Sequence, residues 1–328
     1  MKQKESCWQY LRGLSILAVI ACHVPGYFTP ELKDANYIFY LCVRQAVSFC
    51  VAAFLFVSGY FVVTEKWKVD VIRQIKNRLV RFLIPYFIYS TLYIAWNIFT
   101  ESISGGEYSI RKIFEDYLLG GAAAPLYYII VLVQLTLLTP FLIRVQRKSL
   151  SILILAISPI YIILLYVYAF NTGSYPDHYN VLFCGWISIY YLGIRCRRNH
   201  PLCVFDKIGT VRNCCILYFI CIAEAIILTL VVNNGRIATN QLKLSSLMFA
   251  ACICSFFVNY SNKHQSLKEN GLCKKAILLF GDLSYGIFYT HEFAKVPVLI
   301  IFNRIGLFPF PLAFLLEWLF TALFSSMV

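Results

Sequence analysis

The feature that most constrains this chain is a succession of apolar segments, most of them about 20 residues long, separated by short polar connections. An α-helix of that length crosses the hydrocarbon core of a bilayer and satisfies its own backbone hydrogen bonds there. By residue number the segments are 8–28, 37–63, 79–100, 126–143, 150–170, 180–194, 213–232, 242–260, 276–303 and 306–327. We therefore expect an all-α polytopic membrane protein of about ten transmembrane helices, in which residues 1–328 form a single integral-membrane domain.

The composition excludes most soluble classes of protein. Hydrophobic residues make up 60% of the chain and charged residues only 14%, against roughly 45–50% and about 25% in soluble domains. Such a chain has too little polar surface to cover itself in water. A soluble enzyme and a nucleic-acid-binding protein are excluded on this ground, even though the net charge is +13.

The positive charge instead predicts the orientation in the membrane, because Lys and Arg gather in cytoplasmic loops. Most of them fall in alternate loops, around residues 64–78, 144–149, 195–212 and 261–275. These loops all lie on one face of the predicted topology. With an even number of spans, both termini are expected on that cytoplasmic face.

Ionisable side chains inside apolar spans are costly unless they are paired or hydrated, so each is a candidate functional residue. The spans contain Arg12, His23, Arg44, Glu224, Asp282, His291 and Glu317. We assign no role to the two glutamates.

Arg12 and His23 lie eleven positions apart in the first segment. That separation turns a helix by about 1100°, which is about 20° past three full turns, and advances it by about 16 Å. The two side chains therefore lie on nearly the same face, with a cation near the cytoplasmic surface and a titratable base deeper in the membrane. This arrangement suits an anionic donor that enters from the cytoplasm. The simpler alternatives are that Arg12 is an interface anchor and that His23 is a hydrogen-bonded packing residue.

Arg44 is expected at a depth similar to that of His23, because the second segment runs back from the external side. A cation beside His23 favours the neutral imidazole that a general base requires. Arg44 could equally stabilise an oxyanion, hold an acidic acceptor or serve as an interface anchor.

The cytoplasmic end of the second segment contains Ser58 and Gly59, a small pair that allows either close helix packing or room for a ligand. The following loop leads to Arg78 and Arg81, which share a helical face. Two guanidinium groups at that spacing can bind phosphates. Charge that only sets the membrane orientation is the alternative.

The thirteen cysteines lie mostly within apolar segments, where cysteine packs as a small hydrophobic residue, and no paired CxxC spacing is present. We therefore expect no disulfide framework and no zinc site. His291, in the external half of its span, has no His–carboxylate cluster around it in the sequence. We accordingly expect no metal site.

Five motifs in order along the chain resemble the membrane acyltransferase-3 family. They are Arg12-x10-His23, the segment Phe54–Phe61 with its Ser58-Gly59 pair, Arg78-x-x-Arg81 followed by Pro85, Pro125–Tyr128 with Pro140, and Ser284–His291. Tyr127 stands where the family often has Trp. Arg44 before the serine–glycine segment resembles the small, stand-alone branch that modifies cell-envelope glycans.

The resemblance implies a multi-pass enzyme of the bacterial inner membrane that moves an acyl group, usually acetyl, from cytoplasmic acyl-CoA to a hydroxyl. The acceptors of such families are mostly sugars of surface polysaccharides, lipopolysaccharide among them, or of their lipid-linked precursors. Acyl-CoA is then a co-substrate, and no permanently bound cofactor is expected. By motif position, His23 would be the base that deprotonates the acceptor.

The resemblance also implies a set of binding residues. Arg12, Arg78 and Arg81 would hold the CoA phosphates or shape the donor channel, and His291 would line the site. The full set of expected donor- and substrate-binding residues is Arg12, Arg44, Ser58, Arg78, Arg81, Tyr285 and His291.

Two functions of other classes use the same features. A transporter or flippase for a lipid-linked sugar or an anion would use the buried charges as a pathway, but the paired half-repeats expected of it are not found. A structural subunit of a polysaccharide synthase would tolerate substitution of Arg12 and His23. Expected partners are membrane lipid and a glycan or lipid-linked sugar, with no nucleic acid. Homo-oligomerisation and a partner in polysaccharide assembly stay open.

Overall fold

A computed structural model describes residues 2–24, 35–197, 207–263, 271–305 and 309–327. Every regular element in these ranges is a helix, so the expected all-α class is confirmed for the described part of the chain. The helices are α1 (Lys2–His23), α2 (Ala35–Val47), α3 (Cys50–Tyr60), α4 (Thr64–Val69), α5 (Val71–Ile103), α6 (Ile110–Leu119), α7 (Tyr127–Leu142), α8 (Lys148–Thr172), the 3-10 helix η1 (Phe183–Gly185), α9 (Ile187–Arg197), α11 (Val211–Val232), α12 (Gly235–Ala238), α13 (Leu244–Lys263), α14 (Leu272–Ile305) and α15 (Phe310–Met327).

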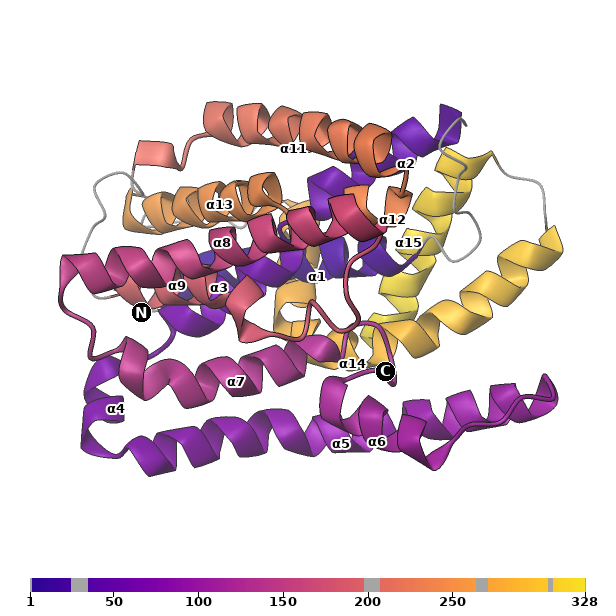
Figure 1. Ribbon diagram of the computed structural model, residues 1–328, viewed down its shortest axis with the longest axis horizontal. Coiled ribbons are helices and arrows are strands. Elements are labelled where there is room, and N and C mark those ends of the chain that lie inside the picture. The colour runs from indigo at the N-terminus through magenta and orange to yellow at the C-terminus, as the bar shows by residue number, and fades with distance from the viewer. Residues whose placement is uncertain (1, 25–34, 198–206, 264–270, 306–308, 328) are drawn as a thin grey trace.

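The long helices α5, α7, α8, α11 and α13 run along the long axis of the molecule and surround α1 (Figure 1). Helix α1 packs against α14, α3, α2, α13 and α15, which places it at the centre of the bundle. Its contact with α14 is close because Gly13 has no side chain: a Cβ there would lie 2.0 Å from the backbone oxygen of Ile277. The two helices that carry the predicted histidines are therefore in direct backbone contact.

Six helical segments in the described ranges are long and apolar enough to cross a membrane: Asn36–Tyr60, Val71–Ile103, Lys148–Thr172, Val211–Val232, Leu244–Ser261 and Phe310–Met327. The first of these joins α2 and α3. Helices α7 and α9 match predicted spans in position but are short, with 16 and 11 residues, and α1 and α14 carry several charged residues. The ten-span topology stays a prediction, and residues 25–28 and 306–308 of its first and last spans lie outside the described residues.

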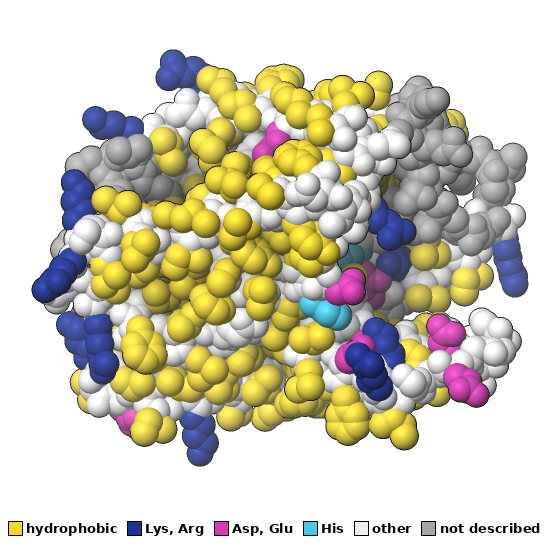
Figure 2. Space-filling model, in the orientation of Figure 1, with side chains coloured by type: hydrophobic (Ala, Val, Ile, Leu, Met, Phe, Trp, Pro, Cys, Tyr) yellow, Lys and Arg dark blue, Asp and Glu magenta, His cyan; other side chains and the backbone are white. Residues whose placement is uncertain are grey.

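The surface has the character expected of a membrane protein. Large apolar side chains are exposed along α5, α8 and α11, and in Figure 2 they form a broad apolar band across the molecule. Lys and Arg gather at the end of the bundle where α4 and the α7–α8 connection lie (Figures 1 and 2). Together with the six apolar helices, this band identifies a multi-pass membrane protein.

The predicted orientation in the membrane concerns the two termini and the basic loops. The N-terminus lies at the Lys- and Arg-rich end, whereas the C-terminus lies nearer the middle of the long axis (Figure 1). Parts of two basic loops, at 198–206 and 264–270, lie outside the described residues. The cytoplasmic location of both termini therefore stays a prediction.

The described cysteines are all free.

Candidate functional site

Two cavities open within the bundle, and they contain most of the predicted site residues. The first, here called the arginine cavity, has a volume of about 520 Å³. Its polar wall consists of Arg12, Ser58, Arg78, Arg81, Asp282, Ser284, Tyr128 and Tyr285. Five of the seven predicted donor- and substrate-binding residues therefore come from α1, α3, α5 and α14 to a single space.

The three arginines of this cavity are held differently. Arg12 is half-buried, with its guanidinium 5.3 Å from the ring centre of Phe61. Arg78 donates hydrogen bonds from Nη1 to the hydroxyl of Tyr190, at 2.9 Å, and from Nη2 to the carbonyl of Ser58, at 2.8 Å. Arg81 is exposed at the cavity wall. Arg78 thus also ties α5 to α3 and α9, whereas Arg12 and Arg81 offer their charge to an occupant.

The Ser58-Gly59 pair both lines a cavity and allows close helix packing, the two alternatives that the sequence left open. Ser58 lines the cavity and accepts the Arg78 bond. Gly59 faces α9, where a Cβ would lie 2.1 Å from the backbone oxygen of Tyr190. Tyr285 donates from its hydroxyl to the backbone carbonyl of Arg81 at 2.5 Å, which joins α14 to α5 beside the cavity.

The second cavity, here called the histidine cavity, has a volume of about 390 Å³. Its polar wall consists of Cys22, His23, Tyr40, Arg44, Tyr127, Tyr128, Tyr179, Asn180, Trp186, Arg236, Thr239, Asn240 and Gln241. His23 and Arg44 therefore share one space, as the similar depth predicted for them requires. The cavity lies among the connections before α7, before η1 and around α12.

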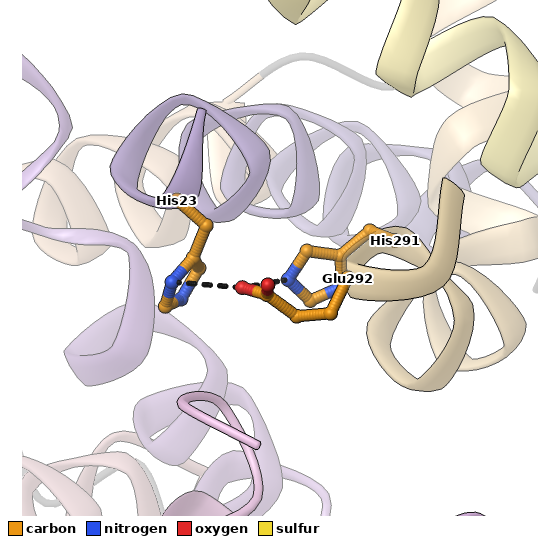
Figure 3. Close-up of side chains that lie close together, drawn as sticks. All are labelled: His23, His291 and Glu292. Atoms are coloured by element: carbon orange, nitrogen blue, oxygen red, sulfur yellow. Dashed lines mark ion pairs between the residues drawn. The ribbon is translucent and has the colours of Figure 1, made fainter. Parts of the chain in front are cut away.

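His23 ends α1 and faces Glu292 of α14 (Figure 3). Its Nδ1 atom lies 3.2 Å from Oε1 of Glu292. The two side chains are therefore within ion-pair distance, although Oε1 of Glu292 accepts no hydrogen bond in the described part of the chain. Lys295 contacts the same carboxylate and donates to the backbone carbonyl of His23 at 3.2 Å. This contact places a cation at the C-terminus of α1, where it is electrostatically favourable.

His291 lies behind this pair. It is 1% exposed, and its ring centre is 5.4 Å from that of His23. Nδ1 of His291 donates to the carbonyl of Ile287 at 2.9 Å. Nε2 consequently carries a lone pair, 4.0 Å from Oε1 of Glu292. His291 therefore supports His23 from the bundle interior, and it is not among the residues that line either cavity.

The premise that no His–carboxylate cluster exists is wrong. One ligand atom each from His23, His291 and Glu292 lie within 4.8 Å of one another, because α14 brings two consecutive residues to the end of α1. The carboxylate of Glu292, however, already pairs with the ammonium of Lys295, and that cation disfavours a divalent metal ion beside it. The absence of a metal stays a prediction.

The sequence reasoning missed Glu292 and Lys295. Glu292 directly follows His291, and Lys295 lies three residues further along the same predicted span, but neither is among the ionisable residues named for the spans. Both are ionisable residues within an apolar segment, which is the signal that could have identified them. Glu224, which was given no role, accepts a hydrogen bond of 2.7 Å from Tyr166 at a site away from His23.

The two cavities share part of their walls. Phe54, Tyr128 and Phe288 line both. The ring of Tyr128 lies 6.3 Å from that of Phe54 and 5.4 Å from that of Phe288. Three aromatic side chains thus separate a space lined by arginines from a space lined by His23.

A family model described as an acyltransferase domain matches residues 6–328. The chain belongs to the acyltransferase-3 family. Comparisons with curated proteins and with solved structures found no significant match. The family makes this protein a membrane acyltransferase, and the resemblance drawn from five motifs is confirmed over nearly the whole chain.

Proposed function

We propose that this acyltransferase moves an acyl group, most simply acetyl, from acyl-CoA in the arginine cavity to a sugar hydroxyl in the histidine cavity. His23 is the general base. The acceptor belongs to a surface polysaccharide or to its lipid-linked precursor, and the enzyme acts in the bacterial inner membrane. The observation that carries this proposal is the pair of cavities that meet at Phe54, Tyr128 and Phe288.

The arginine cavity has the chemistry of a CoA site. CoA carries several phosphate charges, and arginine binds phosphate through paired hydrogen bonds. Arg12 and Arg81 supply this charge at the wall of the arginine cavity. Apolar walls from Phe54, Leu132 and Phe288 suit the thioester arm as it extends toward the second cavity.

The histidine cavity supplies the base. Nδ1 of His23 faces Glu292, so Nε2 is the atom that can take a proton from an acceptor hydroxyl. The hydroxyl oxygen then attacks the thioester carbonyl carbon, the carbon–sulfur bond breaks, and the CoA sulfur leaves with the proton that His23 held. Glu292 stabilises the imidazolium during this step by its charge, in the manner of a carboxylate that orients a catalytic histidine.

Purified protein incubated with radiolabelled acetyl-CoA and a cell-envelope glycan extract tests the proposal. The wild-type protein should label the glycan, and His23→Gln should lose transfer by about 10²- to 10⁴-fold, the usual contribution of a general base. His178 provides a matched control, because it is an exposed histidine with φ of 56° that lines neither cavity. His178→Asn keeps a residue that tolerates this backbone conformation and should retain transfer.

Transfer by His23→Gln at the wild-type rate would overturn the assignment of the base. Movement of a lipid-linked sugar across the bilayer without consumption of acetyl-CoA would instead favour a transporter.

A further inference from the structure

The histidine cavity carries charge of only one sign. Arg44 and Arg236 both line it, beside His23, and no aspartate or glutamate is among its described lining residues. Arg236 lies on the short helix α12 and is exposed, whereas Arg44 comes from α2 and is half-buried. A partly buried positive charge such as that of Arg44, with no carboxylate beside it, is costly in a membrane protein unless something else balances it.

Arg44 is held rigidly but only by neutral groups. Its Nη1 atom donates to the carbonyl of Cys22 at 2.6 Å, and its Nη2 atom donates to the carbonyl of Thr239 at 3.0 Å. Its Nε atom is buried and has no hydrogen-bond partner within the described ranges. No carboxylate in those ranges forms an ion pair with it. The guanidinium is thus fixed in place with its charge unbalanced.

The neighbouring phenol of Tyr179 does not balance this charge. Burial raises the pKa of the Tyr179 phenol, so that this side chain is neutral at physiological pH. Cys22 accepts a hydrogen bond of 3.3 Å from Nε2 of Gln241. A thiolate at Cys22 would be an anion of the cavity wall itself that could compensate Arg44. The experiment therefore includes the variant Cys22→Ser.

Other parts of the wall suit a sugar. Oε1 of Gln241 is buried and accepts no hydrogen bond in the described part of the chain, so it can accept from a hydroxyl group. Trp186 and Tyr127 line the same cavity with their rings 6.5 Å apart. Flat aromatic faces of this kind pack against the C–H faces of a sugar ring.

We propose that the acceptor is an anionic sugar, whose carboxylate or phosphate is bound by Arg44 and Arg236 while a hydroxyl of the same sugar lies at His23. This inference rests on the proposed acyl transfer and narrows its acceptor. The negative charge belongs either to an acidic sugar ring or to the phosphate that links a sugar to its lipid carrier. Both present the oxygen geometry that arginine binds in a bidentate manner.

The test compares three acceptors of similar size with radiolabelled acetyl-CoA: a neutral glucose oligosaccharide, a glucuronate oligosaccharide and a glycosyl phosphate. The wild-type protein should acetylate at least one anionic acceptor with kcat/KM about 10- to 100-fold above the neutral one, as a charged hydrogen bond implies. Preference for glucuronate assigns the charge to the sugar ring. Preference for the glycosyl phosphate assigns it to the lipid linkage.

Two variants locate the effect. Arg44→Gln should raise KM for the anionic acceptor by about 10-fold or more, and should change KM for the neutral acceptor by a much smaller factor. Arg236→Gln should act in the same direction, and since its side chain is exposed it remains informative even if Arg44→Gln does not fold. Arg111→Gln is the matched control, because this exposed arginine pairs with Glu115 on α6 and lines neither cavity.

The outcomes are separable. No transfer to any acceptor by the wild-type protein would overturn the proposed function itself. Equal transfer to neutral and anionic acceptors, with both arginine variants unchanged, would overturn only the anionic acceptor. An anionic preference that appears only in Cys22→Ser would also contradict it, because Arg44 would then be compensated by the Cys22 thiolate in the wild-type protein.

Discussion

Replacement of Glu292 by Gln tests how His23 is made into a base. The substitution keeps the size of the side chain and an oxygen that can accept from Nδ1 of His23, but it removes the negative charge. Nδ1 and Oε1 are 3.2 Å apart. At that distance, the attraction between the carboxylate and the imidazolium formed during catalysis is about 5 kcal/mol at an effective dielectric constant of about 20.

The whole of this attraction will not appear as lost activity, because water and neighbouring dipoles compensate in part. Lys295 acts in the opposite direction, since it contacts Glu292 and would face the imidazolium unpaired once the carboxylate is removed. We therefore expect kcat for acyl transfer to fall about 10²- to 10⁴-fold, the range of general-base catalysis. KM for acetyl-CoA should stay unchanged, because Glu292 does not line the arginine cavity.

The assay is initial-rate transfer of radiolabelled acetyl-CoA to glycan by protein in detergent, with thermal unfolding recorded in parallel. Glu115→Gln is the control, since that carboxylate belongs to an exposed pair with Arg111 on α6. A Glu292→Gln protein that folds and retains wild-type kcat, while His23→Gln is inactive, would refute the carboxylate-assisted base.

Three further substitutions test other parts of the structure. Gly59→Ala should destabilise the protein by about 1–3 kcal/mol, as overpacking does, because the added Cβ would lie 2.1 Å from a backbone oxygen of α9. Gly271→Ala is the control, because a Cβ at Gly271 would lie in open space and should not destabilise the protein. Equal unfolding temperatures for the two variants would contradict the close packing of α3 against α9. Phe288→Ala should increase acetyl-CoA hydrolysis without acceptor, measured by thiol release, because it opens the wall shared by the cavities; an unchanged rate would count against a separating role. Arg81→Gln should raise KM for acetyl-CoA about 10-fold. Arg144→Gln is the control, because Arg144 does not line the arginine cavity and its loss should leave that KM unchanged. Identical KM values for the two variants would mean that CoA binds elsewhere.

The pairing of Arg12 with one cavity and His23 with the other follows from the sequence. Helical geometry puts residues eleven positions apart on nearly one face, and apolar composition requires the helix to span the bundle. The structure agrees, since both side chains of α1 line cavities that share a wall. A local rule of this kind needs only the sequence of one helix.

Contacts between helices could not be derived in the same way. Glu292 reaches His23 only because α1 and α14 pack together, and their sequence separation is too large for helical periodicity to relate them. Arg236 joins Arg44 at the histidine cavity only through the folding of the connection around α12. Arg78 was predicted as a phosphate ligand, whereas its bonds to Ser58 and Tyr190 add a structural role that spacing does not reveal.

The central proposal is that the donor reaches His23 through the arginine cavity and the acceptor through the histidine cavity, and that the two cavities receive their substrates from opposite faces of the membrane. Proteoliposomes of known protein orientation test it most directly, with radiolabelled acetyl-CoA supplied on one face and the glycan acceptor on the other. The account predicts transfer when acetyl-CoA is on the face of Arg81 and the acceptor on the face of Arg236, and no transfer when the two are exchanged. Transfer that requires both substrates on the same face would contradict it.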